Sequence, residues 1–153
     1  MTEPHPIRGD NTAHLISKAR RNINQFLEDE MHRVDLPGLV PSHGDIIAVL
    51  LRIQRMTMSD LADAIQRDRS TVTTLVRKLE KMGYVTMEEN PDDTRSHLVS
   101  LTEKGQNLKE TFCPISESLS LTIWNDIGDA DRLQFRSTLQ KIIKNFQKVK
   151  EKS

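Results

Sequence analysis

The chain has 153 residues, with 22 basic and 22 acidic side chains and a formal net charge of zero. This length suits one domain, or a small domain with oligomerisation helices, and the zero charge excludes the uniformly basic surface of many nucleic-acid-binding proteins. The single cysteine, Cys113, cannot form an internal disulfide, and no apolar stretch approaches the roughly 18 residues of a membrane span. We therefore expect a cytoplasmic protein without a membrane partner or a signal peptide.

The first part of the chain predicts a polar arm followed by two helices. Residues 1–11 are expected to be a flexible arm. Between Thr12 and Val34 apolar residues recur every three or four positions, which predicts an amphipathic helix, and Pro37 and Gly38 then break the pattern. A second helix is expected to begin near Ser42, with Ser42 as its cap. Its apolar residues cover most sides, which predicts a central, buried helix: Ile46, Ile47, Val49, Leu50, Leu51 and Ile53.

Two short helices and a hairpin are predicted next. Residues 55–57 are long enough only for an edge strand, and Thr57 then caps a third helix. Asp68 follows a short turn and caps a fourth helix over residues 69–82, which Gly83 ends in a left-handed conformation. Alternating residues over 84–89 and 97–101 predict two strands with a turn over residues 90–96. Arg95 would lie at the hairpin tip, and Tyr84 would pack at its base.

The remaining residues, 106–153, predict two helices separated near Gly128. Pro114 lies inside the first pattern and is expected to kink that helix. Asp129 is expected to cap the last helix. Its apolar stripe contains Phe135, Leu139, Ile142, Ile143, Phe146 and Val149.

The predicted fourth helix has two different faces. Val72, Leu75, Val76, Leu79 and Met82 share the inward face. The opposite face has hydroxyls near its start and basic residues further on, which suits insertion into a DNA major groove. Residues 66–82 contain five basic and two acidic groups, so a basic patch lies within a neutral chain. An ordinary amphipathic helix with a solvated basic face is the alternative.

The order of the elements distinguishes these alternatives. Two capped helices, a tight turn and then a hairpin indicate a winged helix-turn-helix, in a chain that is mainly α-helical with a small β-hairpin wing. Arg95 would enter the adjacent minor groove, with Asp93 holding its guanidinium by a charge-assisted hydrogen bond. Residues 86–98 contain four acids against one arginine, so we expect weak wing contact with phosphates.

Several strings of this sequence resemble the MarR family of bacterial transcription regulators. They are Leu61-Ala62, Ser70-Thr71-Val72, the run from Leu79 to Val85, Asp93-Thr94-Arg95 and the run from Val99 to Gly105. The resemblance extends over almost the whole chain. The pairing of Asp-x-Arg with Leu-Thr-x-x-Gly is its most specific part. A basic residue after Gly-Tyr-Val, common in the family, is replaced here by Thr86-Met87-Glu88-Glu89.

The resemblance implies a homodimer on double-stranded DNA. Residues 12–34 and 106–153 would be dimerisation helices and residues 35–105 the DNA-binding region, all within a single domain. Two reading helices would then bind a pseudo-palindromic operator, with a repressor as the expected role. The implied DNA-binding residues are Arg69, Ser70, Thr71, Thr73, Thr74, Arg77, Lys78, Asp93 and Arg95.

Family members also commonly respond to a small aromatic or anionic effector. Its walls would come from the first, second and fifth helices, with Arg20, His43 and Arg52 as candidate polar groups; packing or surface roles are the alternative. The histidine spacing predicts no metal site, and we expect no cofactor. Cys113 is expected to be buried and unreactive. A winged helix that binds a protein remains an alternative, and an enzyme is not expected because no catalytic grouping is present.

Overall fold

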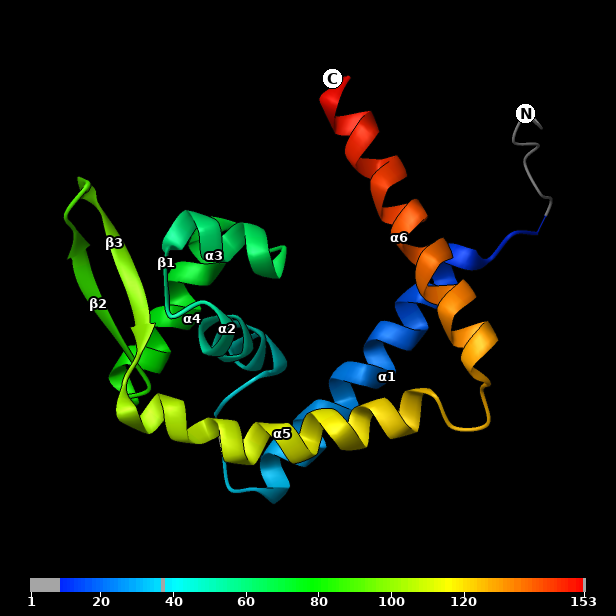
Figure 1. Cartoon of the computed structure of the whole chain (residues 1–153), viewed down its shortest axis with the longest axis horizontal. Coiled ribbons are helices and arrows are strands. Elements are labelled where there is room, and N and C mark those ends of the chain that lie inside the picture. The colour runs from blue at the N-terminus through cyan, green and yellow to red at the C-terminus, as the bar shows by residue number, and fades with distance from the viewer. Residues whose placement is uncertain (1–8, 37, 153) are drawn as a thin grey trace. The chain divides into compact units, whose positions relative to one another are not determined.

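A computed structural model describes residues 9–36 and 38–152 of the chain. It shows α-helices with a small antiparallel sheet, which confirms the predicted fold class (Figure 1). The chain divides into two compact units, one ending at Ser116 and one beginning at Glu117. Most of the predicted arm, residues 1–8, lies outside the described residues.

The first two helices differ from prediction mainly at their ends. Helix α1 (Thr12–Arg33) lies where it was predicted, and α2 (Pro41–Arg52) begins one residue before Ser42. The predicted Ser42 cap is wrong, because Pro41 is the first helical residue and needs no donor there. His43 acts at this end instead, accepting the Val40 N–H at its Nδ1 over 2.9 Å. Ile53 follows the helix and is exposed, not buried as predicted.

Helices α3 (Met58–Ile65) and α4 (Arg69–Lys81) begin at their predicted caps. Thr57 Oγ1 accepts the Asp60 N–H over 3.1 Å, and its hydroxyl donates to the Asp60 carboxylate over 2.8 Å. Gly83 ends α4 at a φ of +81°, the left-handed conformation that glycine adopts without steric cost. The capping residues and Gly83 therefore correctly predicted where α3 and α4 begin and where α4 ends.

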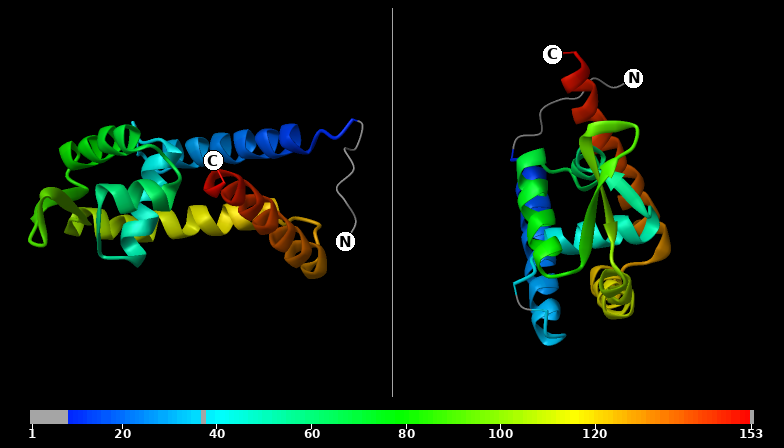
Figure 2. Two further views of the ribbon diagram at one scale, coloured as in Figure 1. Left: turned by 90° about the horizontal axis from the view of Figure 1, so that it is seen from above. Right: turned by 90° about the vertical axis from the view of Figure 1, so that its left-hand side faces the viewer.

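The sheet contains β1 (Arg55–Thr57), β2 (Val85–Asn90) and β3 (Asp93–Leu101) in the order β1-β3-β2. The predicted turn over residues 90–96 is wrong, because only Pro91 and Asp92 form the turn. Asn90 pairs with Asp93 and Glu89 with His97, so residues 94–96 form a bulge in β3. A bulge, like a turn, leaves residues outside the regular hydrogen-bond ladder of the sheet. Residues 94–96 therefore resemble turn residues in sequence. The β2–β3 hairpin extends away from the helices of this unit (Figures 1 and 2).

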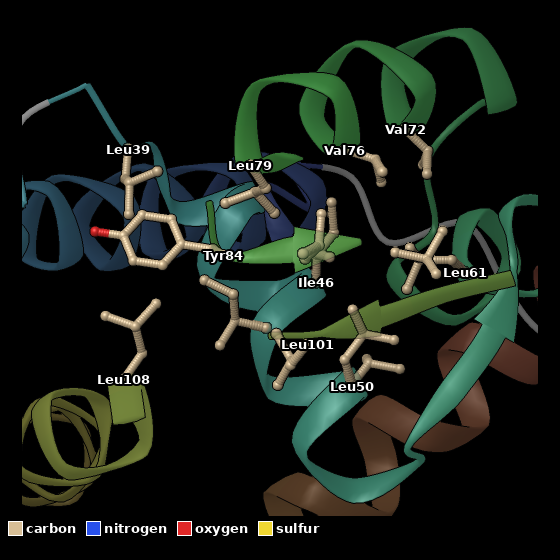
Figure 3. Packing of buried hydrophobic residues seen from close by; sticks show 14 of the residues in the cluster. Leu39, Ile46, Leu50, Leu61, Val72, Val76, Leu79, Tyr84, Leu101 and Leu108 are labelled. Carbon is tan, nitrogen blue, oxygen red and sulfur yellow. The ribbon is translucent and has the colours of Figure 1, made fainter. Parts of the chain in front are cut away.

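One apolar core joins α2, α3, α4 and the sheet (Figure 3). Val72, Val76 and Leu79 of α4 are fully buried, as their spacing predicted. They pack with Ile46 and Leu50 of α2 and with residues of the other elements. Full burial of such side chains contributes about 1.5–3 kcal/mol each, so this core holds α4 with its opposite face outward.

Helix α5 (Glu103–Ile123) starts against the base of the hairpin and continues through Pro114. Thr102 precedes it, accepting the Gly105 N–H over 3.1 Å and donating its hydroxyl to the Gly83 carbonyl over 2.6 Å. Tyr84 is buried at this base, with Lys104 Nζ 4.6 Å from its ring centre, which confirms the packing role predicted for Tyr84.

The second unit contains α6 (Asp129–Glu151), which begins after Gly128; the predicted Asp129 cap is wrong by one residue. Trp124 and Phe135 meet edge to face, with ring centres 6.0 Å apart. The Arg132 guanidinium lies 5.3 Å from the Trp124 ring centre. No residue of α6 is buried within the single chain.

Candidate nucleic-acid interface

The start of α4 is fixed by the carboxylate of Asp68. It accepts the Thr71 N–H over 2.9 Å, the Thr71 hydroxyl over 2.6 Å and the Ser70 hydroxyl over 2.5 Å. These hydrogen bonds, first that from Ser70, hold the pKa of the Asp68 carboxyl well below its usual range. Ser70 and Thr71, both predicted to contact DNA, therefore also stabilise the first turn of α4.

A tight turn places α3 and α4 together. Gln66 adopts a left-handed conformation with φ of +56°, and its N–H donates to the Asp63 carbonyl. The Arg67 N–H then donates to the Ala62 carbonyl over 3.0 Å. The turn thus redirects the chain within a few residues, as the helix-turn-helix prediction requires.

The residues of α4 that were predicted to contact DNA differ in their exposure. Arg69, Ser70, Thr74 and Arg77 are exposed, whereas Thr73 is partly buried. The Thr73 and Thr74 hydroxyls donate to the Arg69 and Ser70 carbonyls, over 2.8 and 3.2 Å. Each oxygen then remains available as an acceptor beside a methyl group, a combination that suits base edges and thymine methyl groups.

Lys78 also lies on α4, but its side chain contacts the loop between α1 and α2. Its Nζ donates to the carbonyl of Gly38, in the loop between α1 and α2. It is therefore placed differently from Arg77, although the sequence predicted the same role for both.

The wing presents Arg95 from the bulge of β3 rather than from the tip of the hairpin. Its side chain is 94% exposed. Asp93 Oδ1 accepts the Arg95 backbone N–H over 3.0 Å, while the guanidinium Nε is 3.7 Å from the same oxygen. The predicted hydrogen bond to the guanidinium is therefore wrong in form, because 3.7 Å is an ion-pair distance only. Asp93 instead fixes the backbone from which Arg95 extends.

Two surface grooves connect α4 to the wing. One brings Arg69 and Arg95 to the same groove, along with Thr57, Ser59 and Asp60 at the start of α3 and Asn90, Asp93 and Ser96 of the hairpin. The other is lined by Met58, Arg69, Thr73, Arg77, Met87 and His97. The fold thus places Arg69, Arg77 and Arg95 along one continuous surface. Sequence reasoning did not select Ser59, Asn90, Met87 or His97, although the strand alternation around His97 could have placed it on this face.

Two of the three candidate effector residues, Arg20 and Arg52, lie in one groove, and the third, His43, lies elsewhere. Arg20 and Arg52 line a groove between α1, α2 and α3 that also contains Asp45. This groove is bounded by α3 and not by the fifth helix, so the effector wall expected from the fifth helix stays a prediction. Burial raises the pKa of the Asp45 carboxyl, and the charges of Arg20 and then Arg67 act against that shift.

His43 does not line this groove and is only 2% exposed. Burial, with a further effect from Lys78, lowers its pKa to about 4, so its ring is neutral at pH 7. With Nδ1 accepting the Val40 N–H, the ring proton is on Nε2, which has no hydrogen-bond partner among the described residues. The His43 ring therefore lies in the interior at the start of α2, and its role as a pocket group stays a prediction.

Cys113 is exposed in the single chain, so its predicted burial is wrong there. Its neighbours on α5 differ, because Phe112 is partly buried and Ile115 is buried. Within residues 9–36 and 38–152, no group of three His, Cys, Asp or Glu side chains is placed to hold a metal ion. No helix in this part of the chain is long and apolar enough to cross a membrane.

Comparison with known proteins identifies relatives of this chain. Residues 40–97 match the model of the MarR family. The HTH-type transcriptional regulator SarZ of Staphylococcus saprophyticus is 34% identical over 103 residues, which cover 65% of this chain and 69% of SarZ.

Solved structures share the fold over most of their length. The MepR–DNA complex of S. aureus matches with a TM-score of 0.80 at 24% identity, covering 87% of this chain and 96% of MepR. BpsR of Bordetella bronchiseptica, whose DNA binding is regulated by 6-hydroxynicotinic acid, matches with a TM-score of 0.77 at 21% identity, covering 87% and 98%. The family match, the SarZ relationship and this shared fold lead to one conclusion: the chain belongs to the MarR family of transcriptional regulators.

Proposed function

We propose that this chain binds double-stranded DNA as a homodimer and represses transcription from a pseudo-palindromic operator. The observation that carries the proposal is the continuous surface on which Arg69 and Arg77 of α4 meet Arg95 of the wing. A neutral chain that concentrates exposed arginines on one face of a helix-turn-helix has a local field suited to the phosphate backbone.

Helix α4 would lie in the major groove. Its first turn carries small hydroxyl side chains, which let the backbone approach base edges closely. Arg77, further along, is exposed, and its guanidinium could bind guanine O6 and N7 together. One such bidentate contact is worth about 1–3 kcal/mol of discrimination between bases. The proposed DNA-contacting set from this helix is Arg69, Ser70, Thr71, Thr73, Thr74 and Arg77.

The wing would reach the adjacent minor groove through Arg95. A narrow minor groove concentrates negative potential and attracts an exposed guanidinium. The remainder of the hairpin opposes this attraction, because Glu88, Glu89 and Asp92 are exposed acids. We therefore propose that the wing contributes through one inserted side chain, and that α4 supplies most of the phosphate contacts.

Homodimer formation is supported by apolar surface that the single chain leaves exposed. In α6, Leu133, Phe135 and Phe146 are 67%, 55% and 68% exposed, and in α1 Leu15 is 54% exposed. Large apolar side chains exposed in clusters mark interaction surfaces. Pairing of two copies would also set the spacing of two reading helices at about one turn of DNA, roughly 34 Å.

A small effector is proposed to control this binding from the groove that contains Arg20, Arg52 and Asp45. Two arginines beside a half-buried carboxyl can hold an anionic group, and Ile65, Ala48 and Val49 supply apolar wall. BpsR, which shares the fold, is regulated by an aromatic acid. For this chain we propose an effector of the same chemical class, a small aromatic acid.

Fluorescence anisotropy tests the DNA-binding function. The purified protein is titrated against a duplex from the DNA upstream of its own gene and against a shuffled duplex of equal composition. We expect tighter binding to the upstream duplex, and about a tenfold or greater loss for Arg77→Ala. Arg21→Ala on α1 removes the same charge as a matched control and should bind like wild type. Equal binding of both duplexes, or equal loss in both variants, would contradict sequence-specific binding by α4.

A further inference from the structure

Lys78 differs from the other basic residues of α4 because it is already bound within the protein. Its Nζ donates to the carbonyl of Gly38, forty residues earlier in the chain. We propose that Lys78 is a positioning residue that fastens α4 to the α1–α2 loop (residues 34–36 and 38–40), so that this loop sets the angle at which α4 presents its DNA-facing surface. The consequence for DNA rests on the proposed function, whereas the contact itself does not.

The loop is anchored to α1 and to the core. The Leu36 N–H donates to the Met31 carbonyl of α1 over 3.1 Å, and the Leu39 N–H donates to the Leu36 carbonyl over 3.5 Å. Met31 and Leu39 are only 2% and 4% exposed. A movement of the end of α1 must therefore carry this loop with it, since packed interiors resist independent shifts.

Gly38 shapes the loop so that Lys78 can reach its carbonyl. Its φ is +83°, a conformation that residues with a side chain rarely adopt. A Cβ added at Gly38 would lie 3.5 Å from Lys78 Nζ, so the ammonium group packs directly against this backbone. The lysine and the glycine therefore form one joint between α4 and the loop.

His43 provides the buried side of the joint. It binds the Val40 N–H at the end of the loop and is enclosed at the start of α2. Burial, and after it the nearby charge of Lys78, lower the pKa of its ring, which is therefore neutral at pH 7. A neutral ring avoids a buried charge beside the exposed Lys78 ammonium, which would be costly. The joint thus connects α1, α2 and α4 through Lys78, Gly38 and His43.

This arrangement gives α1 a direct mechanical connection to the reading helix. Helix shifts of 1–2 Å at subunit interfaces are a common basis of switching. If α1 moves when the dimer rearranges or an effector binds, the loop and Lys78 carry that movement to α4. Because the Gly38 carbonyl fixes the position of its ammonium, we expect Lys78 to add no phosphate contact.

The free protein tests the joint without DNA. Lys78→Met removes the ammonium but keeps the stem, and Lys81→Met makes the same change three residues later as a control. We expect Lys78→Met to raise the pKa of His43, measured by NMR titration, and to accelerate hydrogen exchange of the Leu39 and Val40 amides at least severalfold. Lys78→Arg, which retains a donor, should restore slow exchange. An unchanged His43 pKa and unchanged exchange in Lys78→Met would overturn the joint.

The salt dependence of DNA binding tests its consequence. Each lost phosphate contact reduces the slope of log K against log salt by about 0.9. We expect Lys78→Met to weaken binding severalfold with the slope unchanged. A slope reduced by about 0.9 would show that Lys78 contacts phosphate and that the joint is not its role. If the wild-type protein bound no DNA, the proposed function would fail while the measurements on the free protein would still decide the joint.

Discussion

Asp68 stabilises the start of α4 and also holds side chains of its proposed DNA-facing surface. Its carboxylate holds the first turn of α4 through the Thr71 N–H and the hydroxyls of Ser70 and Thr71. The sequence predicted the cap because Asp precedes the apolar pattern of the helix. It did not predict that two of the proposed DNA-contacting hydroxyls would be bound to that cap.

Substitution of Asp68 tests this dual role. Asp68→Ala should lower the Tm and weaken DNA binding, because it removes the acceptor for the first turn of α4. Asp68→Asn should retain most of the Tm, since asparagine caps helices about as well as aspartate. Thermal unfolding followed by circular dichroism compares the two variants, and an equal Tm for Asp68→Ala and wild type would contradict the cap.

His43 predicts a specific loss of stability in acid. Its folded pKa is about 4 against an ordinary 6.5, so the unfolded chain takes up the proton first as the pH falls between these values. The stability associated with the neutral ring is therefore complete above pH 6.5 and declines toward pH 4. The shift corresponds to about 3 kcal/mol in the free energy of unfolding.

Urea unfolding at several pH values measures this effect. We expect His43→Gln, which cannot titrate, to show a flatter dependence of unfolding free energy on pH between 6.5 and 4. The raised pKa of Asp45 acts in the opposite direction but is common to both proteins, so the difference reports His43. Parallel pH curves for the two proteins would contradict the buried, neutral ring.

At the scale of elements, the start of α5 packs against the base of the wing at Gly105. A Cβ added there would lie 2.1 Å from the Tyr84 carbonyl oxygen, closer than any real contact allows. Gly44 in α2 is a matched control, because its added Cβ would meet only Phe112 Cε1 at 3.9 Å.

Substituting alanine at Gly105 and at Gly44 distinguishes the effect of close packing from the effect of helix propensity on stability. Gly105→Ala should destabilise the protein by about 1–3 kcal/mol or more, since backbone must move to admit the methyl group. Gly44→Ala should be neutral or stabilise by up to about 1 kcal/mol, as alanine is the better helix former. Urea unfolding gives both values, and similar stability for the two variants would contradict the close approach of α5 to the hairpin.

The helices could be predicted from sequence because their apolar spacing and capping residues act locally. The hairpin was less predictable. Asn90, Pro91 and Asp92 signal a turn, but the pairing of Glu89 with His97 depends on the partner strand, which local composition does not specify. The destination of Lys78 was also inaccessible, because its partner Gly38 lies on a loop far away in sequence.

At the scale of the whole molecule, the proposed homodimer predicts the mass in solution. Light scattering at micromolar concentration should give twice the chain mass of 17.5 kDa. Phe146→Glu should shift the mass toward the monomer, because it places a charge on apolar surface that the single chain leaves exposed. Lys144→Glu changes charge on the same helix as a control and should remain dimeric. A monomeric wild-type protein would contradict the proposed assembly.

The proposed DNA-binding surface requires that Arg77 of α4 and Arg95 of the wing contact the same DNA. Anisotropy of the Arg77→Ala and Arg95→Ala double variant on the upstream duplex, at physiological salt, tests this most directly. With about 1–3 kcal/mol lost at each arginine, we predict an affinity reduced by about 30-fold or more. An unchanged affinity in the folded double variant would contradict the placement of the DNA-binding surface.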